Sequence, residues 1–145
     1  GLKEHLEEQG FSEIKVDLSL QKEKGRGVMG LEAGPDIPLA GTLDEHGVAP
    51  YQMLLGALGY CLYWTLHEIL RKQRVDFGEM DVEIRGEKKD AQIAHLEWAK
   101  VDFTIEAAEE DAKKIGKAME LAQKYCSVYY TLDQIADIEV SHKLK

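Results

Sequence analysis

The stretch PYQMLLGALGYCLYWTL, residues 50–66, decides the fold because it predicts one long helix that is apolar on nearly every side. Pro50 suits the first turn of a helix, where its missing N–H costs no hydrogen bond. The pattern continues beyond this stretch and predicts a helix over residues 50–74. A helix that is apolar all round must be buried all round. Gly56 and Gly59 each lower helix propensity by about 1 kcal/mol, which predicts a close crossing with another element at that level.

Patterns on both sides of this helix predict an α+β domain. Apolar and polar residues alternate over residues 11–20, which predicts a half-buried strand, and a turn at residues 24–27 leads to a return strand over 28–32. The elements expected next are an irregular connection over 35–50, strands over 80–85 and 96–106, an amphipathic helix over 108–124, a short aromatic segment over 127–132 and a last strand over 135–144. This order predicts antiparallel sheets wrapped around the long central helix. We expect a single domain over residues 1–145, with residues 1–10 as an N-terminal extension.

The composition excludes several classes of partner. The chain has 27 acidic and 18 basic residues and a formal net charge of −9. Such a surface repels phosphate backbones and anionic lipid, so we expect no nucleic acid and no membrane as partner. The apolar run 53–66 is shorter than the roughly 18–20 residues that span a bilayer and predicts a buried core helix. Residues 1–10 have no apolar signal core, and two cysteines without a secretory context fit a cytoplasmic protein.

The two cysteines lie in unlike contexts. Cys61 is inside the apolar helix, and Cys126 follows the amphipathic helix in the sequence KYCSV. Both have apolar or aromatic neighbours and could meet in a folded core, where the pair would cycle between dithiol and disulfide. Free cysteine is also among the most buried residue types, so both could be inert core residues. The spacing alone leaves both interpretations open.

Two motifs in a fixed order connect these cysteines to known chemistry. The first motif reads Pro50, Leu54, Leu55, Ala57, Leu58, Gly59 and Cys61, and the second reads Ala118, Leu121, Ala122, Lys124, Tyr125, Cys126, Ser127 and Val128. Together with the order of elements from about residue 11 to 145, they resemble the OsmC/Ohr family. The resemblance implies an intertwined homodimer, with active sites at the subunit interface, that reduces hydroperoxides through a cysteine pair. It also implies an external dithiol or thiol reductant, with no metal and no bound organic cofactor.

The resemblance implies a role for each thiol. Cys61 corresponds to the cysteine that attacks the peroxide, and Cys126 to the resolving cysteine. Burial in an apolar helix raises the pKa of a thiol, so a reactive Cys61 needs a cation nearby. Family members use an arginine from the N-terminal hairpin, held by a glutamate near the start of the central helix. Lys24 and Arg26 lie in the matching turn, and the planar fork of Arg26 suits a carboxylate partner better.

The family glutamate is absent from this chain. Tyr51 and Gln52 stand at the corresponding place. The amide oxygen of Gln52 could accept a hydrogen bond from an arginine, and Asp44 or Glu45 in the preceding loop could replace the carboxylate. The departure leaves two alternatives to peroxidase activity open. These are a non-catalytic protein of the same fold that binds a small apolar ligand, and a redox sensor whose disulfide changes its associations.

Five residues near the cysteines in the two motifs are candidates for a substrate pocket. They are Tyr51, Gln52, Met53, Trp64 and Tyr129. The aromatic ones among them could equally fill a dimer core. The five histidines show no metal-ligand spacing, so we expect no metal site.

Overall fold

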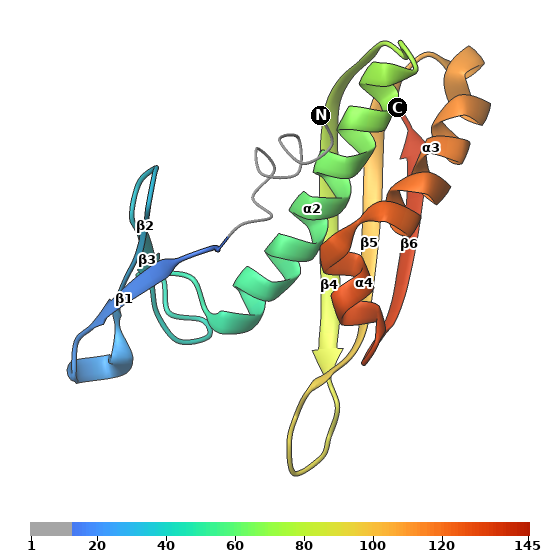
Figure 1. The fold of residues 1–145 in the computed structure, drawn as a ribbon. Helices are drawn as coiled ribbons and strands as arrows, with labels where there is room; N and C mark the ends of the chain where they lie inside the picture. Colours follow the sequence, from blue (N-terminus) through green and yellow to red (C-terminus); the bar gives the residue numbers. More distant parts are fainter. Residues whose placement is uncertain (1–12) are drawn as a thin grey trace. The chain divides into compact units, whose positions relative to one another are not determined.

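The first part of the chain is a three-stranded antiparallel sheet in the order β1-β2-β3. In this computed structural model the described residues are 13–145, so the proposed extension at 1–10 lies outside them. The sheet consists of β1 (Val16–Leu20), β2 (Gly27–Leu31) and β3 (Ile37–Leu39), with the short 3-10 helix η1 (Glu23–Gly25) between β1 and β2. It belongs to a compact unit that ends at Met53, whereas residues from Leu54 onward form a second unit (Figure 1).

The predicted hairpin is confirmed, because β1 and β2 pair in antiparallel register from Val16↔Leu31 to Leu20↔Gly27. Strand β3 lies within the segment predicted to be irregular, which is a correction. The strand was not predicted because it contains Pro38, and proline is rare inside sheets. It is tolerated here because β3 is an edge strand that pairs only with β2.

The second unit contains the long helix and a second sheet. Its elements are α2 (Pro50–Lys72, from Leu54 onward), β4 (Phe77–Lys88), β5 (Leu96–Ala107), the 3-10 helix η2 (Glu109–Asp111), α3 (Ala112–Tyr125), α4 (Ser127–Asp133) and β6 (Asp137–Leu144). The predicted long helix, both middle strands, the amphipathic helix and the last strand are therefore present. The aromatic segment at 127–132 forms the short helix α4.

The second sheet has the order β4-β5-β6, and its strand directions correct one expectation. The strands β4 and β5 are antiparallel, as expected, whereas β5 and β6 are parallel. A parallel pair needs a crossover connection, which helices α3 and α4 supply between the two strands. The α+β class is confirmed, and the second sheet is mixed rather than antiparallel.

Helix α2 buries one stripe of its surface. Leu58, Leu62 and Leu66 are fully buried and lie four residues apart. A Cβ added at Gly59 would stand 2.5 Å from the side chain of Ile84 on β4, so any larger residue here would require the Ile84 side chain to move. The predicted close crossing is confirmed at Gly59. At Gly56 a Cβ would meet nothing within 4 Å.

The opposite face of α2 is not buried within one chain. Tyr60 is 68% exposed and Trp64 is 54% exposed, so burial on all sides is not achieved by this chain alone. By length and composition, α2 is the described helix that could cross a membrane. The stretch of α2 that is long and apolar enough to cross a membrane extends beyond residues 53–66, which were the basis of the prediction. The core helix of a soluble protein meets the same test, and the leucine stripe of α2 is the packing such a helix shows.

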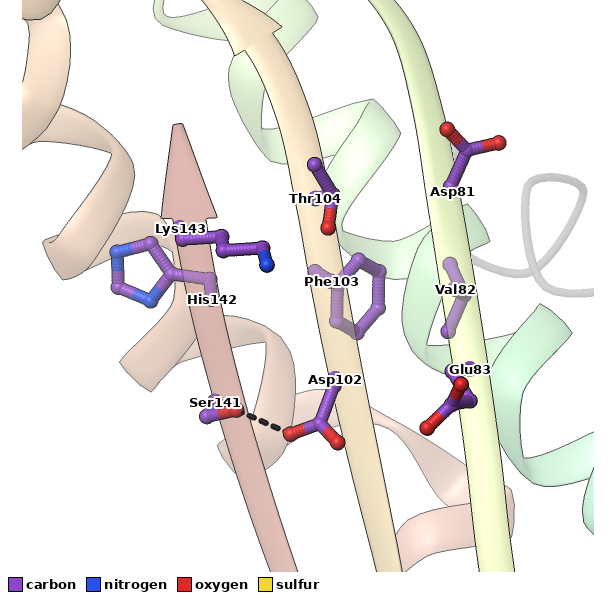
Figure 2. Close-up of a pocket in the computed structure, with 9 residues that line it drawn as sticks. All are labelled: Asp81, Val82, Glu83, Asp102, Phe103, Thr104, Ser141, His142 and Lys143. Atoms are coloured by element: carbon purple, nitrogen blue, oxygen red, sulfur yellow. Dashed lines mark hydrogen bonds between the residues drawn. The ribbon is translucent and has the colours of Figure 1, made fainter. Parts of the chain in front are cut away.

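The two faces of the second sheet differ in chemistry because side chains alternate along each strand. On β5, Ala99, Val101 and Phe103 are at most 1% exposed and belong to the core. Asp102 and Thr104 point to the other face, which carries polar side chains. The helices of the second unit lie behind the sheet in Figure 2, so the core is between the helices and the apolar face.

Candidate active site

The structure brings the two cysteines together, although they belong to different elements. Cys61 is half-buried in the middle of α2, and Cys126 is buried between α3 and α4. Both are free thiols, and they lie close enough for Cys126 to have the largest influence on the pKa of Cys61. Cys61 lies two residues after Gly59, at which α2 approaches Ile84 of β4. A thiol pair in this position has the composition needed for disulfide chemistry.

The pKa of the Cys61 thiol is lowered to about 5, chiefly because the Cys126 thiol donates a hydrogen bond to the Cys61 sulfur. Burial acts in the opposite direction, as the sequence predicted. Further donors are the backbone N–H of Val128 and both the hydroxyl and the N–H of Ser127. These hydrogen bonds favour the thiolate form of Cys61. Within the second unit, neutral donors lower the pKa of Cys61, whereas the sequence predicted a cation nearby.

The pKa of Cys126 moves in the opposite direction. Its hydrogen bond to Cys61 and its burial both raise the pKa well above the ordinary range of a thiol. The proton of the pair therefore stays on Cys126, and the negative charge stays on Cys61. The Cys126 sulfur also accepts a hydrogen bond from the backbone N–H of Tyr129 at 3.4 Å, which caps the start of α4. The two thiols are thus chemically unequal before any reaction.

Ser127 is a site residue that the sequence analysis did not select. It follows Cys126 directly and begins α4, where a backbone N–H has no partner within the helix. The sequence feature that could have identified Ser127 is its place directly after Cys126 in the motif KYCSV. At the first position of a helix, both the backbone N–H and the side chain are available to donate hydrogen bonds. The serine hydroxyl is a donor that most residues at this position would lack.

The first unit contains a second cluster of charged groups around Arg26. The Nε of Arg26 donates to Oδ2 of Asp44 at 2.9 Å, and the Nη2 of Arg26 donates to Oδ1 of Asp44 at 3.2 Å. The pKa of Asp44 is held well below its usual range, first by Arg26 and then by the backbone N–H and the ring of His46. Among the carboxylates considered from the sequence, Asp44 reaches the arginine.

Gln52 has a different partner. Its amide oxygen accepts a hydrogen bond from the backbone N–H of Ala49 at 2.8 Å. Ala49 directly precedes α2, so this contact satisfies a backbone donor at the start of the helix in the manner of a capping box. Lys24 is exposed and has a left-handed backbone with φ of 55°. Among residues 13–145, Arg26 is the one of the two basic candidates with a carboxylate partner.

The residues predicted to line a substrate pocket are divided between the units. Tyr51, Gln52 and Met53 belong to the first unit, and Trp64 and Tyr129 to the second. Trp64 lies in a row of rings on α2, with its centroid 5.3 Å from that of His67. Burial raises the pKa of Tyr129. That these five residues line one pocket remains a prediction.

A cavity of about 590 Å³ lies over the polar face of the second sheet (Figure 2). Asp81, Glu83 and Asp102 line it, and the Ser141 hydroxyl donates to Asp102 at its edge. The thiols lie on the helical side of this sheet, so this cavity does not contain them. Among residues 13–145 no group of three or more His, Cys, Asp or Glu side chains is placed to hold a metal ion.

Comparison with known proteins is consistent with this geometry. A family model described as OsmC-like protein matches residues 41–141. Protein YhfA of Escherichia coli is 25% identical over 113 residues, which are 77% of this chain and 84% of YhfA. A hypothetical protein from Aquifex aeolicus has a TM-score of 0.79 at 21% identity, covering 92% of this chain and 97% of its own. The organic hydroperoxide resistance protein OhrB of Bacillus subtilis has a TM-score of 0.63 at 13% identity, covering 90% and 98%.

Proposed function

This chain belongs to the OsmC-like protein family, and we propose that it is a thiol-dependent peroxidase that reduces organic hydroperoxides. The observation that carries the proposal is the hydrogen-bonded pair of Cys61 and Cys126, in which the pKa of Cys61 is lowered to about 5. The thiolate is the form of cysteine that attacks an O–O bond. Solved structures similar to this chain include organic hydroperoxide resistance proteins, which supports this reaction class.

The proposed reaction has two chemical steps in the protein. The Cys61 thiolate attacks the terminal oxygen of the hydroperoxide, so an S–O bond forms, the O–O bond breaks and an alcohol leaves after gaining a proton. Cys61 then carries a sulfenic acid, and the Cys126 sulfur condenses with it to give a disulfide and water. An external dithiol or thiol reductant returns the disulfide to two thiols and is itself oxidised. The cycle needs no metal and no bound organic cofactor.

Arg26 is the proposed cation of the reaction, as the resemblance implies, with Lys24 as the weaker candidate. The doubt raised by Tyr51 and Gln52 at the family's glutamate position loses weight, because Asp44 supplies a carboxylate to Arg26 through two hydrogen bonds. A guanidinium fixed in this way is pre-oriented for an anionic partner. We infer that Arg26 stabilises the Cys61 thiolate and the developing negative charge on the peroxide.

The working form is proposed to be a homodimer with its active site at the subunit interface. Two apolar surfaces support this inference. On β1, Val16, Leu18 and Leu20 are 51%, 57% and 61% exposed, and on α2 the rings of Tyr60 and Trp64 are 68% and 54% exposed. Contiguous apolar surfaces of this kind mark protein–protein contacts. A cytoplasmic location remains our expectation for a protein with two reduced thiols.

A direct assay tests the proposed function. The reduced protein is mixed with cumene hydroperoxide and a dithiol, and peroxide consumption is compared between the parent and Cys61→Ser. We expect catalytic turnover by the parent and none above background by the variant. Equal rates for the two proteins would remove Cys61 from the mechanism.

The departure at Tyr51 and Gln52 also keeps a second function in view. A protein of this fold could bind a small apolar ligand without turnover, or its disulfide could act as a redox signal. A co-purified ligand in a native mass spectrum, together with no peroxide consumption, would favour the binding function. Stoichiometric oxidation without turnover, with a change in partner binding, would favour the sensor.

A further inference from the structure

The proposed peroxidase cycle ends when an external thiol opens the disulfide between Cys61 and Cys126. The thiolate of the reductant can attack either sulfur, and the sulfur that is not attacked leaves with the electron pair of the S–S bond. This choice decides which cysteine carries the reductant as a mixed disulfide. Two factors determine it, the access to each sulfur and the quality of each sulfur as a leaving group.

We propose that the reductant enters at Cys61 and that Cys126 is the sulfur that leaves. The inference rests on the proposed function, in which the two thiols form a disulfide. The thiolate of the reductant bonds to the Cys61 sulfur, the bond between the two cysteine sulfurs breaks, and Cys126 departs as a thiolate that takes a proton from water. A second thiolate of the reductant then attacks the reductant's own sulfur in the mixed disulfide. Cys61 leaves as a thiolate, and the reductant, which has lost two electrons to the protein, departs as a disulfide.

The first support is the difference in exposure between the two cysteines. Cys126 is 1% exposed, whereas Cys61 is only half-buried. Under the proposed function a hydroperoxide has to reach Cys61, so a path from solvent to this sulfur is already required, and a reductant can use the same path. Cys126 has no such requirement, because its reaction partner in the resolving step is Cys61 itself. Access therefore favours attack on Cys61.

The second support is that the backbone of Cys126 is fixed at the junction between α3 and α4. Its N–H donates to the carbonyl oxygen of Ala122 at 2.9 Å, and its carbonyl oxygen accepts a hydrogen bond from the N–H of Tyr130 at 3.0 Å. Neither bond involves the sulfur, so disulfide formation leaves both in place. A reductant could reach the Cys126 sulfur only after this junction had opened. Each hydrogen bond that opening breaks lowers the population of the open state by roughly 5-fold.

Leaving-group chemistry does not reverse this preference. In the reduced pair the pKa of Cys61 is lowered chiefly by the Cys126 thiol, but that thiol has lost its hydrogen in the disulfide, so a departing Cys61 lacks its main stabilising contact. The pKa of Cys126 is raised first by Cys61, and this cause is absent once Cys61 is bonded to the reductant. The N–H of Tyr129, which lies 3.4 Å from the Cys126 sulfur, can then stabilise the departing thiolate. The two sulfurs become more similar as leaving groups, so access decides between them.

The position of the mixed disulfide tests the proposal. The parent is oxidised with one equivalent of cumene hydroperoxide, freed of residual peroxide and mixed with 2-mercaptoethanol as the probe. The reaction is stopped with acid after short times, the protein is unfolded, and the free cysteine is alkylated with N-ethylmaleimide. Peptide mass spectrometry then reports which cysteine carries the probe. The same oxidised protein unfolded in urea before the probe is added is the control, because both sulfurs are then accessible.

In the folded protein we expect the probe on Cys61 at least about 10-fold more often than on Cys126, and in urea on both to similar extents. An equal distribution in the folded protein, or an excess on Cys126, would overturn this inference and leave the peroxidase function intact. The same excess on Cys61 in urea would also overturn it, because burial of Cys126 would not be the cause. If cumene hydroperoxide yields no disulfide, the proposed function fails, and this inference fails with it.

Two matched variants measure access without a reductant. Cys126→Ser keeps Cys61 as its one thiol, and Cys61→Ser keeps Cys126. The rate of labelling by iodoacetamide is followed as urea rises toward, but stays below, the unfolding transition. Labelling that requires local opening accelerates with urea, so Cys126 should accelerate and Cys61 should not. The same urea dependence for both thiols would overturn the enclosed position of Cys126 and the inference built on it.

Discussion

The Arg26–Asp44 cluster and the Cys61–Cys126 pair hold negative charge by different means. Asp44 is a half-buried carboxylate stabilised by a full positive charge on Arg26 and by His46. The Cys61 thiolate is stabilised by neutral donors, the Cys126 thiol, Ser127 and the N–H of Val128, in a half-buried position. A hydrogen bond is electrostatically stronger where water is excluded, and an ion pair is weaker where water is present. The number of formal charges at a site is therefore a poor guide to how strongly it holds an anion.

The largest effect should come from removing the Cys126 donor. In Cys126→Ala the pKa of Cys61 should rise from about 5 toward about 8.5, the value of an ordinary thiol. Cys126→Ser keeps a donor and a cap for α4, so it should retain a low pKa although it cannot form the disulfide. The rate of iodoacetamide alkylation as a function of pH measures both values. If the pKa of Cys61 stays low in Cys126→Ala, groups other than Cys126 stabilise the thiolate.

The close approach of α2 to β4 can be tested through the two glycines of the helix. Gly59→Ala introduces a Cβ that overlaps the Ile84 side chain, and it should lower the free energy of unfolding by about 1–3 kcal/mol. Gly56→Ala has open space and is the matched control, with stability unchanged or raised by about 0.5–1 kcal/mol. Urea unfolding measures both. Equal effects of the two substitutions would contradict the close crossing.

A smaller effect should follow from loss of the Ser127 hydroxyl. Ser127→Ala should raise the pKa of Cys61 by about 1 pH unit, because a hydrogen bond to a charged group contributes about 1.5–3 kcal/mol and Ser127 is exposed. Thr131→Ala removes a hydroxyl from the same helix that bonds to the Ser127 carbonyl, and it should leave the pKa unchanged. Matching alkylation profiles for the two variants would exclude the serine from the site.

The smallest effect should come from the ion pair between Arg26 and Asp44. The pKa of Asp44 is lowered in the folded state, so its stabilisation is fully present above the ordinary pKa of about 4 and is lost progressively as the pH falls from there through the much lower folded-state pKa. Asp44→Asn should therefore lower the thermal midpoint slightly at pH 7, and this difference from the parent should shrink as the pH falls below about 4. Glu45→Gln should show no such pH dependence. A constant difference between parent and Asp44→Asn across this range would exclude the ionic contribution.

The regular elements could be predicted from the sequence because their patterns are local. Helix α2 was expected over 50–74 and ends at Lys72, since a long apolar run preceded by proline has few alternatives. Strand β3 was missed because Pro38 obscures it, and the parallel direction of β6 depends on a crossover that no local pattern encodes. Those features are decided by pairing between distant segments.

The candidate site divides in the same way. The motifs identified Cys61 and Cys126, and the structure brings the two thiols together. The partner of Arg26 could not be chosen from the sequence, because Asp44 lies 18 positions away across a loop whose path depends on β3. Ser127 escaped attention because its contribution comes from where a short helix happens to begin.

One proton shared unequally between two sulfurs has a consequence for acid conditions. Because the pKa of Cys61 is about 5, a fall from pH 8 to pH 6 leaves most of its nucleophile intact. A free dithiol with ordinary pKa values near about 8.5 loses nearly all of its reactive form over that interval. In an acidified compartment, reduction of the disulfide by the external thiol would then be slower than the reaction of Cys61 with the peroxide. The oxidised protein would accumulate there.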